Sequence, residues 1–481
     1  MRPFHLEKRM QLRSGSTIVK FDRQFPIYNF FFPNQGKARA AASVPQVWNE
    51  AARHVRSRAL YFHIPFCDTI CNFCPFTRGR YSSRAVIDEY FASLLAEIRL
   101  KADLIDLKRV PVSAIFFGGG TPSLLDPEQI VELGELIRRT FDLSHLREFS
   151  FEVEAKSLTP ARAQAMRAIG VTHPRFGLQS FSPKWRDMFD LTATLDQIHD
   201  AAALLKQCFP YQTFDILYGM SGQDEEELIA DLESAVALGT TNVDIYPIDN
   251  IVTQVGLHAK LEAAGAAPTS AMRKFGMNLL IDQAMRHAGF MPHNGHGYVR
   301  TPATGDVVSD AYSFVYHEHV YGYHDHDLMG FGVNAISSTM GHVLTQTHSK
   351  KVYREAIAQG RVPCEISRHE RALDFARPIV LRLPYHGRLD KRHVRWGAVH
   401  PEVLEKLDRV RQEGFVVEDD TSVALTKLGW YWYVNLMYYL MPNADQLLMN
   451  GMVIDKLKDP GRRFSKRELL FPLVSAQVAE G

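Results

Sequence analysis

Short apolar segments alternate with amphipathic segments from residue 59 to about residue 250, and this alternation constrains the fold more than any other feature of the chain. The apolar segments have the length of strands and the segments between them have helical spacing, a rhythm typical of parallel βα units. Six such units with connections of the same form fit a partial (β/α)6 barrel better than a doubly wound sheet. The expected strands are ALYFHI (59–64), VSAIFFGG (112–119), EFSFEVE (148–154), HPRFGLQ (173–179), QTFDILYGM (212–220) and NVDIYPI (242–248). Functional residues are then expected at the carboxyl ends of these strands, where the βα loops meet.

Three segments flank the barrel, which we place at residues 58–250. Residues 1–57 contain the aromatic cluster FPIYNFFFPN and are expected to form an irregular arm that packs on the core. Residues 251–363 extend the barrel and supply a substrate pocket. In residues 364–481, a helical pattern, a turn at Gly414, a short hairpin and a final helix follow one another. We therefore predict an α/β protein: a partial (β/α)6 barrel with an irregular N-terminal arm and a mainly helical, winged-helix-like C-terminal cap domain.

Charge and hydropathy narrow the range of partners. The 481 residues include 55 Lys and Arg against 54 Asp and Glu, so no global field attracts a nucleic acid or an anionic membrane. The N-terminus lacks the apolar segment of a secretory signal, and WYWYVNLMYYLM (430–441) is too short to span a bilayer. We expect that aromatic segment to be a buried helix, although its rings could also wall a flat substrate. We expect a cytoplasmic monomer that acts on a small molecule, without nucleic-acid or membrane partners.

The segment YFHIPFCDTICNFCPFTRGR (61–80) carries three of the five cysteines, Cys67, Cys71 and Cys74, directly after the first strand. In a reducing compartment such clustering indicates metal or redox chemistry rather than disulfides. Three thiolates can hold a [4Fe-4S] cluster at three irons and leave the fourth open to another ligand. Zinc is the alternative, with His63 as the nearby fourth ligand. Cys208 and Cys364 lie in unrelated contexts and are expected to be ordinary structural residues.

The motifs Y-x-H-I-P-F-C-x3-C-x-F-C, F-F-G-G-G-T-P-S, F-E-V-E, G-L-Q-S-F and D-I-L-Y-G occur in this order between residues 61 and 219. In them the chain resembles radical S-adenosylmethionine (SAM) enzymes, and within these the group of oxygen-independent coproporphyrinogen III oxidase. The resemblance implies that SAM chelates the open iron and that one electron cleaves it to methionine and a 5'-deoxyadenosyl radical. It also implies a reducing partner such as flavodoxin or ferredoxin.

The resemblance assigns two SAM molecules and their contacts. The first SAM would contact Tyr61, also a catalytic candidate, and Phe73, Gly119 and Glu152, and Ile336 joins the SAM-binding set. The second would contact Gly120, Thr121, Gln179 and Asp215. Glycines after a strand let the backbone approach a ligand and present N–H groups to a carboxylate, but the run 118–120 also fits a plain tight turn. Gln179 and Asp215 could equally be core residues that satisfy backbone groups at strand ends.

Two positions depart from the oxidase pattern. Leu191 stands where the oxidase has an arginine about a dozen residues after the equivalent of Gln179, so the second SAM site is altered or another base serves it. Phe76 stands where the oxidase has an extra cysteine two residues past the third ligand. Both differences speak against porphyrinogen decarboxylation itself.

The segment YHEHVYGYHDHD (316–327) places His317, His319, His324 and His326 within ten residues. Imidazoles in such number can bind a metal or shuttle protons. The alternation of His317, His319, Tyr321 and Tyr323 equally fits one face of a strand that lines a polar pocket. A solvated strand and loop is the third interpretation.

Three functions remain in view. The leading hypothesis is one-carbon transfer, in which a methylene radical of the second SAM adds to an unsaturated carbon, giving C-methylation or a cyclopropane. The first alternative is anaerobic tetrapyrrole chemistry, either coproporphyrinogen III-type oxidative decarboxylation or haem ring opening. The second is a haem or iron–sulfur carrier without turnover.

Overall fold

The computed structural model describes residues 42–74, 76–248, 269–300 and 315–449, together with Phe21, residues 32–33 and 38–39 and parts of 257–265. Within these residues, none of the helices combines the length and the apolar character needed to cross a membrane. Most of the predicted N-terminal arm lies outside the described residues. Where it is described, it contains a helix, α1 (Val44–Ala51), so the arm is not irregular throughout.

The six predicted barrel strands are confirmed and lie side by side in chain order. They are β2 (Ser57–Ile64), β5 (Val112–Gly119), β6 (Glu148–Val153), β7 (His173–Gln179), β8 (Thr213–Tyr218) and β9 (Asn242–Pro247). Every neighbouring pair is parallel. Their carboxyl ends therefore meet at one edge, and this edge carries the site described below.

The sheet continues on both sides of the barrel strands. Beyond β2 lie β12 (His326–Phe331), which is parallel to β2, and then β13 (Ile336–Thr339), β14 (His342–Gln346), β15 (Cys364–Arg368) and β1 (Ala38–Arg39). Beyond β9 lie β11 (Gly297–Arg300) and β10 (Phe290–Pro292), both antiparallel to their neighbours. The predicted domain boundaries stay predictions, and the main sheet runs on as far as β15.

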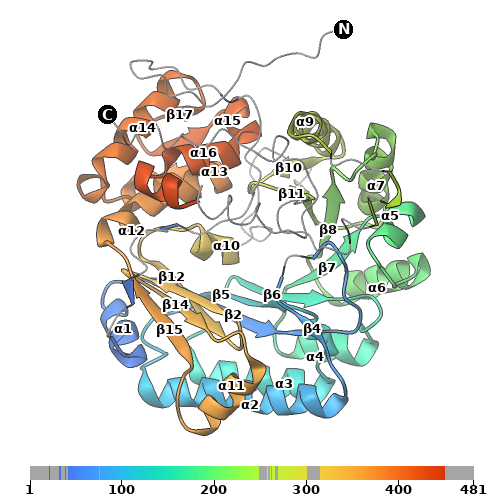
Figure 1. Ribbon diagram of the computed structural model, residues 1–481, viewed down its shortest axis with the longest axis vertical. Coiled ribbons are helices and arrows are strands. Elements are labelled where there is room, and N and C mark those ends of the chain that lie inside the picture. Colours follow the sequence, from blue (N-terminus) through green and yellow to red (C-terminus); the bar gives the residue numbers. More distant parts are fainter. Residues whose placement is uncertain are drawn as a thin grey trace.

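Helices cover the outer face of the sheet (Figure 1). They are α2 (Arg84–Leu104), α3 (Pro127–Thr140), α4 (Pro160–Ala168), α5 (Pro183–Met188), α6 (Leu195–Cys208), α7 (Glu225–Ala237), α9 (Ala271–His287) and α11 (Lys350–Ala358). Capping boxes begin α3, α6 and α7. In each, the side chain of the N-cap residue accepts from the backbone N–H of the third helical residue, whose own side chain accepts from the backbone N–H of the N-cap residue. Leu60, Ile115 and Phe149 belong to one large core with buried residues of these helices.

The C-terminal region has a core of its own. A three-stranded sheet, β16 (Arg388–Asp390), β18 (Ser422–Leu425) and β17 (Val416–Glu418), accompanies α12 (Arg371–Arg377), a π-helical segment (Pro378–Arg382), α13 (Leu383–His386), α14 (Pro401–Gln412), α15 (Lys427–Tyr431) and α16 (Tyr433–Leu440). Every residue of α16 is buried, as predicted, but the aromatic segment is not one helix: α15 ends at Tyr431, and α16 begins only after Trp432. The region lies above the carboxyl ends of the barrel strands, as the predicted cap does (Figure 1).

The histidine-rich segment does not form a strand from His317 to Tyr323, which was one interpretation of its alternating pattern. Residues Val315–Val320 form a short helix, α10, a turn follows, and β12 begins only at His326. His317 and His319 therefore point to different surroundings: His317 faces the cavity described below, and the His319 Nε2 atom lies 3.0 Å from both Ser57 Oγ and Ser113 Oγ. The interpretation as a strand is wrong, whereas His317 does line a pocket.

Candidate active site

The three clustered cysteines line one small cavity at the end of β2. Cys67 ends the short strand β3 (Phe66–Cys67), which pairs with β4 (Gly79–Arg80), and Cys71 and Cys74 follow in the loop. All three are free thiols around a space of about 190 Å³. Arg78 stabilises the loop by donating to the Cys71 and Phe76 carbonyl oxygens.

The electrostatics of this loop suit a cationic centre. Burial, and then the neighbouring thiols and Glu154, raise the pKa of Cys71 to about 12. Burial also raises the pKa of Cys67 to about 11, although a hydrogen bond with the Thr121 side chain acts in the opposite direction. Ionised thiolates here therefore need a positive partner, which the irons of a cluster would supply.

A single zinc ion fits less well than a cluster. Among the described residues, no group of three His, Cys, Asp or Glu side chains is arranged to hold one metal ion. His63, the candidate fourth zinc ligand, uses both ring nitrogens elsewhere: the Tyr61 hydroxyl lies 2.9 Å from Nδ1 and the Thr77 carbonyl oxygen 3.0 Å from Nε2. The three cysteines line one cavity together, and three thiols beside an open space fit a [4Fe-4S] group.

The glycine turn after β5 packs closely against other parts of the protein, whereas the sequence predicted a close approach to a ligand. Gly119 has φ +108° and donates its N–H to Glu152 Oε2 at 3.1 Å. Gly120 and Thr121 donate theirs to the Ile64 and Phe66 carbonyl oxygens at 2.8 and 2.7 Å. These N–H groups are thus used inside the protein instead of being presented to a ligand. The glycines instead let the end of β5 pack directly against the strand that carries Cys67.

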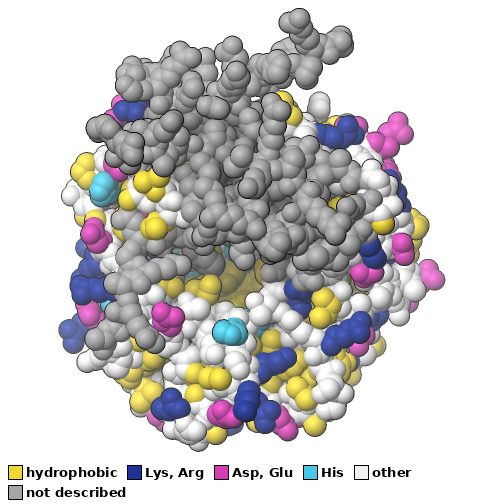
Figure 2. All heavy atoms as spheres, viewed as in Figure 1, with side chains coloured by type: hydrophobic (Ala, Val, Ile, Leu, Met, Phe, Trp, Pro, Cys, Tyr) yellow, Lys and Arg dark blue, Asp and Glu magenta, His cyan; other side chains and the backbone are white. Residues whose placement is uncertain are grey.

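A larger cavity of about 420 Å³ adjoins the cysteine loop. Tyr61, Phe73, Gly119, Glu152, Gln179, Asp215 and Ile336 all line it, whereas Gly120 and Thr121 line the cysteine cavity. The structure thus brings the predicted SAM-binding residues together, and their individual roles stay predictions. In the space-filling view, hydrophobic side chains gather in a hollow between the positions of α10 and β6 (Figure 2).

One wall of the larger cavity is aromatic. The rings of Tyr61 and Phe116 stack at 6.1 Å between centroids, and those of Phe116 and Tyr316 stack at 4.6 Å. Rings from β2, β5 and α10 therefore form one continuous surface, which suits a planar, conjugated ligand.

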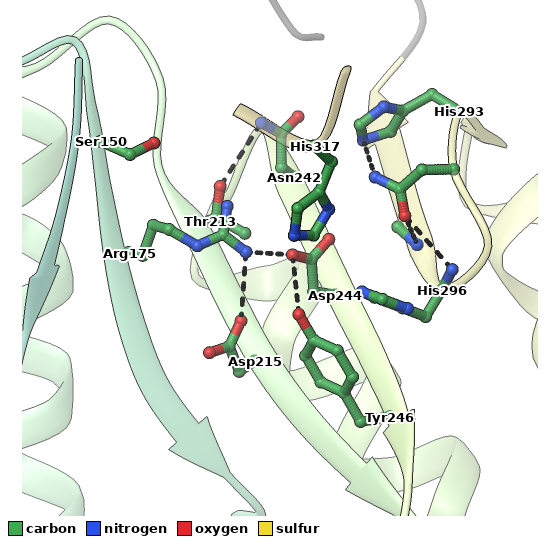
Figure 3. A network of polar contacts seen from close by, with 12 residues as sticks. Ser150, Arg175, Thr213, Asp215, Asn242, Asp244, Tyr246, His293, His296 and His317 are labelled. Carbon is green, nitrogen blue, oxygen red and sulfur yellow. Dashed lines mark hydrogen bonds and ion pairs between the residues drawn. The ribbon is translucent and has the colours of Figure 1, made fainter. Parts of the chain in front are cut away.

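A network of charges around Arg175 also lines this cavity, and the guanidinium lies 5.9 Å from the centre of the Phe116 ring (Figure 3). Its guanidinium pairs with Asp244 and lies 3.7 Å from Asp215 Oδ1. Burial would raise the pKa of Asp244, but Arg175 beside it holds that pKa below its usual range. Burial raises the pKa of Glu152 to about 7 and that of Asp215 to about 8, because Arg175 compensates these carboxyls only in part. A positively charged ligand would therefore be favoured beside Glu152 and Asp215.

Comparison with known proteins agrees with this arrangement. Residues 61–235 match the model of the Radical SAM superfamily. The matched residues contain the three cysteines and the strands β5 to β8. Over longer stretches the chain is similar to oxygen-independent coproporphyrinogen III oxidase and to anaerobilin synthase, and a match to the superfamily implies a [4Fe-4S] cluster and SAM.

Two curated relatives cover most of this radical SAM chain. Anaerobilin synthase of Escherichia coli O157:H7 is 24% identical over 87% of this chain and 92% of its own length. Oxygen-independent coproporphyrinogen III oxidase of Salmonella typhimurium is 25% identical over 78% of this chain and 83% of its own. Heme chaperone HemW of Mycobacterium tuberculosis is 30% identical, but over only 39% of this chain and 49% of its own length.

A solved structure shows the same fold. Coproporphyrinogen III oxidase from Escherichia coli matches with a TM-score of 0.71 and 21% identity, over 86% of this chain and 96% of that chain. The match covers most of this chain, so the C-terminal region as well as the parallel sheet shares the fold of that protein.

Sequence reasoning missed several polar residues of this radical SAM site. Arg175, Asp244, His296 and Tyr385 were not singled out, although Arg175 and Asp244 interrupt the apolar strands HPRFGLQ and NVDIYPI. A charge inside a strand buried on both faces is itself a signal, because it must be paired. Leu191 packs in an apolar cluster beside the cysteine cavity, and Arg175 lines the same cavity, so a base does lie beside Asp215.

Proposed function

We propose that this protein is a radical SAM enzyme that acts on a tetrapyrrole, with anaerobic opening of the haem ring as its reaction. The main support is the similarity to anaerobilin synthase over 87% of this chain and 92% of that enzyme, which includes the elements outside the barrel strands. Residues of α10 and of the segment before β11 line the cavity beside the barrel strands, so similarity there bears on the substrate.

The cavity has the chemistry that a haem would need. The wall of Tyr61, Phe116 and Tyr316 offers stacked apolar surface to a flat macrocycle. The same cavity is lined by His296 and His317; burial lowers the pKa of His296 to about 4 and that of His317 well below its usual range, so both rings are neutral at pH 7. Neutral imidazoles can bind iron or exchange protons with a substrate.

Two departures favour ring opening over coproporphyrinogen decarboxylation. Leu191 replaces the arginine expected by resemblance to the oxidase, and Phe76 replaces its extra cysteine. Phe76 is 57% exposed and lines both cavities, so it presents an apolar ring where that cysteine would be. The comparisons do not support the one-carbon transfer hypothesis, because the two relatives named above that cover most of the chain are an anaerobilin synthase and a coproporphyrinogen III oxidase.

Each group of residues would have its own role in this reaction. Cys67, Cys71 and Cys74 would hold the [4Fe-4S] cluster, which together with SAM supplies a 5'-deoxyadenosyl radical when bound. Glu152 would accept from the SAM amine or ribose, and the Gly119 N–H orients its carboxylate. The apolar wall would exclude water from the reacting carbon. A flavodoxin or ferredoxin would supply the electrons.

The test is an anaerobic assay of the reconstituted protein with SAM and a chemical reductant, with either haem or coproporphyrinogen III as substrate. We expect 5'-deoxyadenosine formation that requires haem, loss of the haem Soret band and growth of a linear tetrapyrrole absorbance. Haem binding without 5'-deoxyadenosine would instead indicate a chaperone. S-adenosylhomocysteine, with deuterium moving from the SAM methyl group into 5'-deoxyadenosine, would refute the proposal in favour of one-carbon transfer.

A further inference from the structure

One tyrosine joins two histidines at the edge of the larger cavity. The Tyr385 Oη atom, on α13, lies 2.6 Å from His317 Nδ1, on α10, and 3.1 Å from His296 Nε2, just before β11. Tyr385 is fully buried, and both imidazoles line the cavity. Three segments that are far apart in sequence thus fix the orientation of the two rings.

Both burial and the neighbouring groups favour the neutral form of His317. Burial lowers its pKa well below 6.5, and His296, Arg175, His386 and His293 lower it further by disfavouring a second positive charge. A neutral imidazole keeps one nitrogen lone pair, and the hydrogen bond at the other nitrogen decides which one.

The shared tyrosine couples the tautomers of the two rings. A hydroxyl has a single proton, so Tyr385 can donate to one imidazole while it accepts from the other. In the arrangement in which Oη accepts from Nδ1–H of His317 and donates to Nε2 of His296, the His317 lone pair sits on Nε2, the ring nitrogen farthest from the helix backbone. Histidines that bind metals show this arrangement, in which the second nitrogen donates to an orienting partner.

Helix α10 is itself fixed in place. The Glu148 carboxylate accepts from the N–H groups of Val315 and Tyr316 at the first turn. Tyr316, next to His317, belongs to the aromatic wall, and the two rings lie 5.7 Å apart. The helix thus presents an apolar ring and an imidazole to the same cavity.

From this arrangement we propose that His317 Nε2 is a ligand of the haem iron, with Tyr385 as its positioning residue. The proposal rests on the tetrapyrrole function proposed above. An imidazole bound to the iron would fix the depth and orientation of the macrocycle against the aromatic wall, and thereby select which ring carbon faces the SAM side of the site.

His296 is the less suitable ligand of the two. Its Nε2 is used by Tyr385, which leaves Nδ1, the nitrogen closest to its own backbone. Its ring also packs on Tyr246 at 4.1 Å between centroids. His296 therefore orients Tyr385, which in turn orients His317.

The experiment is an anaerobic titration of the reconstituted protein with ferric haem b, followed by absorption and electron paramagnetic resonance without SAM or reductant. The wild type should show a histidine-ligated spectrum. His317→Ala and the larger His317→Gln should lose that spectrum and bind haem at least tenfold more weakly, and added imidazole should restore the spectrum of the alanine variant. Tyr385→Phe should keep haem bound with a shifted spectrum.

His319→Ala is the matched control, because His319 lies on the same helix but contacts Ser57 and Ser113 behind it. His287→Ala, at the exposed end of α9, is the surface control. Both should give the wild-type spectrum.

A wild-type spectrum without a histidine ligand would overturn the proposal, as would unchanged spectra in both His317 variants. If such variants still consumed haem, the proposed function would survive without the ligand assignment. A wild type that neither binds nor consumes haem would refute both the ligand assignment and the proposed function.

Discussion

Replacing Glu148 by glutamine tests whether a buried carboxyl holds α10 in place. Glu148 is fully buried at the start of β6, where it accepts from Ser150 Oγ at 2.6 Å and from the first N–H groups of α10. Burial raises its pKa from 4.5 to about 7, against the opposing effects of these hydrogen bonds and of Arg175. Glutamine has the same shape, can accept the same backbone N–H groups and cannot ionise.

The sign of the effect follows from proton linkage. Between pH 4.5 and 7 the folded protein holds a proton on Glu148 that the unfolded chain releases, so stability is highest below pH 4.5 and falls as the pH rises to 7. The pKa of Glu148 differs by about 2.5 units between the folded and the unfolded protein, which corresponds to about 3 kcal/mol of stability. The wild type loses this stability above pH 7, and Glu148→Gln does not. For a chain of 481 residues that is roughly 3 °C in Tm.

The assay is thermal unfolding of cluster-free protein at several pH values from 5 to 8, so that iron loss does not contribute. The difference in Tm between Glu148→Gln and wild type should grow as the pH rises, whereas the exposed Glu135→Gln should follow the wild type throughout. Parallel curves for Glu148→Gln and wild type would refute the buried-carboxyl reasoning. A variant that was less stable at every pH would show that the ionised carboxylate itself is needed to cap α10.

Three further outcomes are expected. Replacing Cys67, Cys71 and Cys74 together by alanine should abolish bound iron and 5'-deoxyadenosine formation, while Cys208→Ala and Cys364→Ala keep both. Glu152→Ala should weaken SAM binding by about 1.5–3 kcal/mol, roughly 10- to 150-fold in Kd by equilibrium dialysis, with the cluster intact; unchanged affinity would make Glu152 structural. Gly120→Ala would place a Cβ atom 2.5 Å from the Phe66 carbonyl oxygen, so it should cost ~1–3 kcal/mol and lower the iron content per chain, and full iron retention would argue against the close approach.

The barrel strands were predictable because parallel strands buried on both faces appear as continuous apolar runs between helical patterns. The cysteine loop was predictable for a related reason: its three ligands lie within eight residues and directly after a strand. Both patterns depend on residues that are close together in the sequence, and the structure has the strands and the cysteine loop where the sequence indicated them.

The substrate side of the cavity was not predictable, because its contacts are not local. The start of α10 is fixed by Glu148, 167 positions earlier in the chain, and six residues are too few for a helical period to outweigh an alternating pattern. The hydrogen bonds of Tyr385 join residues 68 and 89 positions away. The spacing of residues in the sequence cannot predict contacts between positions so far apart.

The two halves of the cavity are therefore built on different principles. The strands β2, β5, β6, β7 and β8 carry most of the residues predicted to bind SAM, so their geometry is fixed by the parallel ladder. His317 and Tyr385 lie on short helices and depend on contacts between the barrel and the C-terminal region. A change in α10 or α13 can thus alter which molecule is held without moving the cysteines or Glu152. The different substrates of proteins that share this barrel would then arise from these short helices rather than from the strands.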